Sequence, residues 1–242
     1  MRQIAKKPWF DLVVILASGG VVCLGLYLYS IVLNHGITDP FLVVNLLLAG
    51  IPILLSWRLV VVLKKKLWSA WEPLLYTFLW IIFLPNSFYM VSDYIHLESI
   101  NPNVILYSAV MYTAFIFLAL LLGVVSLYIV HQELKKRISK RSAAMVVVIL
   151  LLGCSFAIYL GRDMRWDSWD IVLNPGGVLF DISNLLLQPH TYPDMMRTIT
   201  SFFALLGSIY FIIWRFAYIL WRSGVKDMAR HIKQEQHNPK LS

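Results

Sequence analysis

The chain alternates long apolar runs with short polar connections. Six runs reach the length of about 20 residues that an α-helix needs to cross the hydrocarbon core of a bilayer. Because backbone polar groups cannot stay unpaired in lipid, each run is predicted to be a helix. The pattern therefore predicts an all-α, polytopic transmembrane bundle within one domain, residues 1–222, followed by a basic cytoplasmic tail, 223–242. The predicted spans cover approximately residues 9–33, 41–63, 73–92, 104–130, 143–161 and 198–222.

Composition agrees with the membrane class. Of the 242 residues, 59% are hydrophobic and only 14% are charged. The mean hydropathy is +0.71. Soluble domains usually carry about a quarter charged residues, so the composition excludes an ordinary soluble enzyme.

The positions of the basic residues predict the orientation. Of the 21 Lys and Arg residues, 18 lie in the terminal segments or beside connections on the same side of the bundle. The opposite connections, 93–103 and 162–197, hold the other three. The positive-inside rule therefore places both termini in the cytoplasm and these two connections outside. Contact with anionic lipid explains the net charge of +8, so nucleic acid is not an expected partner.

The first unusual polar stretch ends the third predicted span. Asn86, Tyr89, Asp93 and His96 are spaced by three, four and three residues, which places them on one face of an α-helix. In one interpretation the first two bond to neighbouring helices and the last two mark the water interface. In the other, Asp93 and His96 bind a cation or share a proton, because a carboxylate orients an imidazole and raises its basicity.

The second unusual stretch leaves the fifth predicted span. Residues 161–170 contain two Arg, three Asp and two Trp. If the helix persists, Arg162, Arg165 and Trp169 share one face, and the aspartates share the neighbouring face. External arginines run against the positive-inside bias, so they need a partner. Pairing with Asp93 or with the local aspartates is one explanation, and holding an anionic phosphate or carboxylate group is the other.

The last external connection contains a further apolar segment, residues 178–187. It is too short to cross a bilayer, so we expect an interfacial or re-entrant segment. It could act as a lid over the outer polar residues or simply lie at the interface.

Both polar stretches resemble the motifs of the bacterial domain-of-unknown-function-1361 (DUF1361) family. The first matches Asn-x-x-Tyr-x-x-x-Asp-x-x-His-Leu over 86–97, and the second matches Gly-Arg-x-x-Arg-Trp-x-Ser-Trp-Asp over 161–170. The family pattern has Asn where this chain has Asp167, which argues against a strict charge requirement there. The resemblance implies a multi-pass protein of the bacterial cytoplasmic membrane and supplies no reaction.

Three functions compete on the sequence alone. The first is an outer-leaflet site at the ends of the third and fifth spans that binds or processes an anionic lipid or an envelope-linked substrate. The second is a noncatalytic scaffold or subunit that docks another envelope protein. The third, a transporter, ranks last because few polar residues line the remaining path through the membrane. No catalytic motif of a known class is present, so enzymatic activity stays open.

The first hypothesis assigns roles to individual residues. Asp93 and His96 are the candidates for acid–base chemistry, with a divalent cation as the expected cofactor if one is bound. The candidate ligand-binding residues are Asn86, Tyr89, Arg162, Arg165, Trp166, Trp169 and Asp170, and the candidate metal ligands are Asp93, His96, Asp163 and Asp170.

Overall fold

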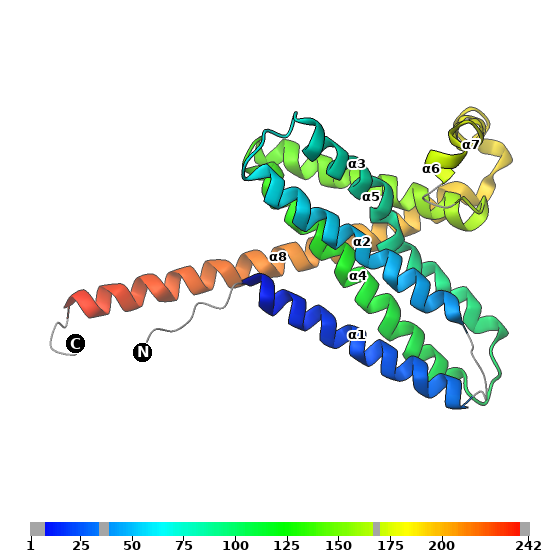
Figure 1. Cartoon of the computed structure of the whole chain (residues 1–242), viewed down its shortest axis with the longest axis horizontal. Coiled ribbons are helices and arrows are strands. Elements are labelled where there is room, and N and C mark those ends of the chain that lie inside the picture. The colour runs from blue at the N-terminus through cyan, green and yellow to red at the C-terminus, as the bar shows by residue number, and fades with distance from the viewer. Residues whose placement is uncertain (1–7, 34–38, 167–169, 238–242) are drawn as a thin grey trace. The chain divides into compact units, whose positions relative to one another are not determined.

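The structure, a computed structural model, describes residues 8–33, 39–166 and 170–237. The described part of the chain is helical and contains no strand. Figure 1 labels the α-helices among its elements. The elements are α1 (Pro8–Leu33), α2 (Pro40–Leu63), α3 (Trp71–Tyr89), the 3-10 helix η1 (Met90–Ser99), α4 (Ile105–Lys135), α5 (Lys140–Asp163), α6 (Asp170–Leu173), α7 (Pro175–Leu187), the 3-10 helix η2 (Pro189–Thr191) and α8 (Pro193–His237).

Six long helices in the described residues are apolar enough to cross a membrane. They lie in the six runs that the sequence predicts, and the all-α fold of a multi-pass membrane protein is thereby confirmed. The main difference is at the end of the chain. The apolar part of α8 covers Pro193–Leu220, but the helix continues to His237 instead of ending near 222.

Contacts between Cα atoms divide the chain into two units, Met1–Phe203 and Ala204–Ser242. The second unit is helical from Ala204 to His237, as the continuation of α8. The first unit contains α1 to α7 and the beginning of α8, and it contains the candidate site described below.

Helices α2, α3 and α4 form the centre of the first unit, and α4 is the most buried of the six candidate spans. Polar groups link these helices: the Trp80 indole donates to Ser126 at 2.7 Å, and the Ser87 hydroxyl donates to the Ala49 carbonyl at 2.8 Å. Gly123 permits the close approach of α3 and α4, since an added Cβ would lie 2.7 Å from Ser87. Such small residues and hydroxyl bonds are typical of packing between membrane helices.

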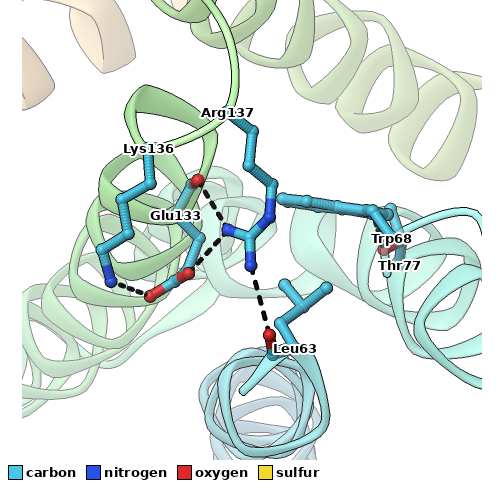
Figure 2. A network of polar contacts seen from close by, with 6 residues as sticks. All are labelled: Leu63, Trp68, Thr77, Glu133, Lys136 and Arg137. Carbon is cyan, nitrogen blue, oxygen red and sulfur yellow. Dashed lines mark hydrogen bonds and ion pairs between the residues drawn. The ribbon is translucent and has the colours of Figure 1, made fainter. Parts of the chain in front are cut away.

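A second polar network joins the ends of α2 and α4 to the beginning of α3, as Figure 2 shows. The Arg137 guanidinium donates to the Glu133 carboxylate at 2.8 Å and to the Leu63 carbonyl at 3.3 Å, and it lies 5.4 Å from the centroid of the Trp68 ring. The Trp68 indole in turn donates to Thr77 at 2.9 Å. Because each charge has a partner within the network, we interpret it as a brace for α2, α3 and α4.

Candidate functional site

The polar residues of the third span lie where α3 changes into η1. This point, the beginning of α2 and the end of α5 together define what we call the η1 end of the first unit. Asn86 and Tyr89 belong to α3, and Asp93 and His96 belong to η1. The sequence predicts a continuous α-helix here, which is wrong beyond Tyr89. A 3-10 helix repeats every three residues, so Asp93 and His96 still lie on the same side.

Asp93 is buried, with 3% of its surface exposed. Its carboxylate oxygen Oδ2 accepts a hydrogen bond from the Asn45 side chain at 3.1 Å. Asn45 comes from α2, so this bond joins α2 to η1. A buried carboxylate is costly unless polar groups satisfy it, and Asn45 meets part of that need.

His96 lies nearer the surface than Asp93. It is exposed, and its imidazole packs against the ring of Phe41, with the ring centroids 4.6 Å apart. Phe41 lies in the first turn of α2, one turn before Asn45 on the same helix face. The beginning of α2 therefore contacts both residues of the predicted acid–base pair.

These side chains line one end of a cavity of about 800 Å³. All four residues predicted from the third span line it, so the grouping inferred from their spacing is observed. The volume lies within the range typical of small-molecule sites. Its lining residues come from α2, α3, η1, α5, α6, α7 and the segment after α5: Phe41, Val44, Asn45, Leu48, Ile81, Ile82, Leu84, Pro85, Asn86, Tyr89, Asp93, His96, Ile149, Leu150, Gly153, Cys154, Ala157, Leu160, Gly161, Trp166, Ile171, Val178 and Ile182.

Away from the η1 end the cavity is apolar, and its edge reaches the surface of the helices. Ile81 and Ile149 line it and are nevertheless exposed, by 46% and 63%. In a helix that crosses a bilayer, an exposed apolar side chain at mid-span faces lipid. The cavity therefore borders the surface that lipid chains would contact.

The end of α5 packs against the end of α3, as the sequence predicts. Arg162 donates to the backbone carbonyl of Ser92 at 2.9 Å. Gly161 lies against the Tyr89 ring, and an added Cβ would be 3.2 Å from it. The arginine expected to pair with Asp93 thus bonds to the backbone one residue earlier.

Helix α5 does not continue through the Arg- and Trp-rich stretch. It ends at Asp163, and the Trp166 N–H returns to the Leu160 carbonyl at 3.2 Å. Arg165, which lies between Asp163 and Trp166, adopts a left-handed backbone with φ of 59°. The condition for a shared helix face, a helix that persists through Arg165, is therefore not met. Asp163 and Arg165 are both exposed, and the cavity lining contains neither arginine.

Trp166 connects the end of α5 to α7. It lines the cavity, and its indole Nε1 donates to the Asp181 carboxylate at 2.8 Å. Val178 and Ile182, one helical turn apart on α7, also line the cavity. The apolar segment predicted at 178–187 is thus a helix with one face on the cavity, as a lid requires. Its start is capped by Asn174, whose side chain accepts from the Gly177 N–H at 3.1 Å.

The remaining predicted residues are only partly described. Asp170 is half-buried at the start of α6, and Trp169 and Asp167 lie outside the described residues. Among the residues that the structure describes, no three His, Cys, Asp or Glu side chains are grouped as metal ligands would be. Asp93, His96, Asp163 and Asp170 therefore do not form such a group.

Three contributors to the site were not among the residues predicted for it. They are Phe41, Asn45 and Asp181. Asn45 carries the clearest signal, because an amide inside an apolar span needs a partner on another helix. The contacts of Phe41 and Asp181 depend on tertiary packing, which spacing along the chain does not reveal.

Fold and site together define an α-helical, multi-pass membrane protein with a cavity that joins a polar end to an apolar groove. The model of a protein family described as protein of unknown function (DUF1361) matches residues 44–210, and the chain belongs to that family. The match contains both sequence motifs and most of the cavity lining. Neither a curated protein nor a solved structure matches the chain.

Proposed function

We propose that this membrane protein binds a chain-bearing amphiphile, with the polar group at the η1 end and the hydrocarbon chain in the apolar part of the cavity. The observation that carries the proposal is that the cavity lining has a polar end and an apolar remainder. Asn45, Asn86, Tyr89, Asp93 and His96 gather at one end, whereas the lining contributed by α5 is apolar apart from the thiol of Cys154.

The length of the cavity along α5 supports a lipid chain rather than a small polar ligand. On α5 the lining runs from Ile149 to Gly161, twelve residues apart, which corresponds to about 18 Å at the rise of an α-helix. One leaflet contributes about 15 Å of hydrocarbon thickness. The groove is therefore long enough for a chain that extends from a headgroup region to the middle of the bilayer.

The proposed site belongs to the outer leaflet. This assignment rests on the distribution of Lys and Arg, which favours both termini in the cytoplasm and hence the η1 end outside. Exposed apolar side chains on α7, Leu179 and Phe180, would then lie in the outer headgroup region, as in other interfacial helices.

Processing of the bound amphiphile is a further step that the same residues support. Asp93 and His96 are one 3-10 turn apart, both on the cavity, and a carboxylate and an imidazole are the usual groups for proton transfer. The binding proposal does not depend on that step.

Docking of an envelope protein is the second candidate function. It rests on a different surface, the exposed apolar side chains of α6 and α7, of which Leu173 and Leu187 are 76% and 78% exposed. A protein that copurifies in a fixed ratio and is lost after their replacement by Ser would favour docking over lipid binding.

The binding proposal is tested by photolabelling the full chain in nanodiscs with hexadecanol that carries a diazirine on its chain. This neutral probe makes the result independent of headgroup charge. Cys154 is 3% exposed and Ala157 is half-buried, so label on either reports entry into the cavity more specifically than label on the lipid-facing surface. We expect both to be labelled.

The decisive variant is Gly153→Phe. Gly153 lines the cavity, and an added Cβ there would meet nothing within 4 Å, so we expect a phenyl group to be tolerated and to occupy the groove. Gly25→Phe is the matched control, because Gly25 also has open space but lies on α1 away from the cavity. Loss of cavity labelling in Gly153→Phe alone supports the proposal. Unlabelled Cys154 and Ala157 in the unmodified chain, or equal labelling in both variants, would overturn it.

A further inference from the structure

The charges around the polar end discriminate between headgroups. The chain has 21 Lys and Arg residues, yet none is among the side chains described around the cavity. Asp93 is the one carboxylate in that lining. Arg162, a candidate phosphate ligand from the sequence, is outside the lining and donates to the Ser92 carbonyl, from where its charge also acts on Asp93. A phosphate placed here would meet a buried carboxylate without the arginine fork that usually binds it.

Aromatic side chains surround the same end. Phe41, Tyr89 and Trp166 line the cavity, and each comes from a different part of the fold. Phe41 packs on His96, while the Tyr89 ring lies against Gly161, which also contacts the backbone of Trp166. Phe41 and Tyr89 are therefore within the region of the η1 end that contains Asp93, and the Trp166 indole lies on the α7 side of the same lining.

Aromatic faces together with one carboxylate are the chemistry that binds an ammonium group. The ring faces attract a cation through their quadrupoles, and the carboxylate supplies the full opposite charge. A quaternary ammonium also tolerates a partly apolar surround better than a phosphate does, because its charge is spread over the C–H groups that flank the nitrogen.

We infer that the cavity takes an ammonium-bearing ligand, with the cationic nitrogen between Asp93 and the aromatic side chains. This inference rests on the proposed function for the position of the chain, and it replaces an anionic headgroup by a cationic or zwitterionic one. An aminolipid of the outer leaflet is the ligand class that satisfies both parts of the lining.

The test is competition against the hexadecanol photoprobe, with the full chain in dodecyl maltoside micelles. The competitors are tetradecyltrimethylammonium, tetradecyl phosphate and tetradecanol, each at the same mole fraction in the micelle. We expect the ammonium compound to protect Cys154 and Ala157 at a mole fraction about tenfold lower than the phosphate does, as a charge-assisted contact requires. Equal or better protection by the phosphate would overturn the inference.

Two variants test whether the preference for the ammonium compound depends on the Asp93 carboxylate or on negative charge in general. Asp93→Asn keeps the shape and should remove the advantage of the ammonium compound over tetradecyl phosphate. Glu98→Gln is the matched control, because Glu98 is an exposed carboxylate of the same 3-10 helix and lies outside the lining. If Asp93→Asn does not fold, Phe41→Leu replaces it, since it removes one aromatic face and should weaken the same preference. An ammonium preference that survives in the folded variant contradicts the inference.

The outcomes also distinguish this inference from the proposed function. If the photoprobe does not reach Cys154 or Ala157, the amphiphile-binding function itself fails. If it does and the phosphate competes best, binding stands and the ammonium assignment falls. Competition by tetramethylammonium at a similar concentration would keep the ammonium chemistry but assign it to a free compound rather than a lipid headgroup.

Discussion

The Asn45 side chain donates a hydrogen bond to the buried carboxylate of Asp93, at the polar end of the cavity. The donor comes from a span that is otherwise almost wholly apolar, and the acceptor is buried at the beginning of η1. In an environment with little water, a stranded carboxylate loses more than the strength of the bond itself. This pair therefore positions Asp93 on the cavity as well as joining two elements.

Replacing Asn45 tests that role. Asn45→Leu should lower the free energy of unfolding by about 1–3 kcal/mol, because the buried carboxylate of Asp93 loses a donor. The measurement is thermal or denaturant unfolding of the full chain in detergent micelles.

A double-mutant cycle with Asp93→Leu supplies the control. Because removing both polar partners leaves neither one stranded, the double variant should be more stable than the sum of the single effects predicts, by about 1 kcal/mol or more. Additive losses would show that Asn45 and Asp93 are energetically independent, contrary to this account.

At the scale of elements, the sequence predicts the spans well because length and apolar content alone determine them. It also brings Asn86, Tyr89, Asp93 and His96 together correctly, since a spacing of three or four residues places them on one side of either kind of helix. The change to a 3-10 helix at Met90 has no such signal. The end of α5 is equally hidden, because Arg165 adopts a left-handed backbone that favours Gly or Asn.

The link between α5 and α7 is the clearest tertiary feature that the sequence does not reveal. Trp166 and Asp181 are fifteen residues apart, and their hydrogen bond holds α7 beside the cavity. Spacing rules for a single helix cannot relate residues on two elements joined by a loop. The segment 178–187 is therefore predictable as a short apolar element, whereas its face on the cavity comes only from the structure.

Removing the Trp166 donor should loosen α7 without unfolding the spans. Trp166→Phe keeps an aromatic ring but cannot donate to Asp181, so we expect backbone amides of α7 to exchange about tenfold faster, as loss of a hydrogen bond to a charged group implies. Hydrogen–deuterium exchange with mass spectrometry measures this rate segment by segment.

Ser183→Ala is the comparison for that experiment. The Ser183 hydroxyl bonds within α7 to the Leu179 carbonyl at 2.7 Å and does not link α7 to another element. Its loss should leave exchange nearly unchanged. Equal acceleration in both variants, or none in Trp166→Phe, would mean that the indole contact does not hold α7 in place.

For the whole molecule, orientation decides which leaflet the cavity serves. The helices themselves are compatible with either direction, since length and apolar content do not distinguish the two sides of a bilayer. The asymmetry lies in the connections: the loop between α4 and α5 is rich in Lys and Arg, whereas η1 and α7 carry acidic residues. The positive-inside rule converts that asymmetry into a direction.

Single cysteines can test this direction. The background is Cys23→Ala with Cys154→Ala, which removes both buried thiols. Ser183→Cys on α7 and Ser139→Cys before α5 each place a thiol at an exposed position. In intact cells a membrane-impermeant maleimide should label position 183 and leave 139 unlabelled, because the positive-inside rule predicts the Lys- and Arg-rich loop to be inside. After permeabilisation both positions should react. The reverse pattern in intact cells would move the cavity to the inner leaflet, where an ammonium headgroup would be bound from the cytoplasmic side.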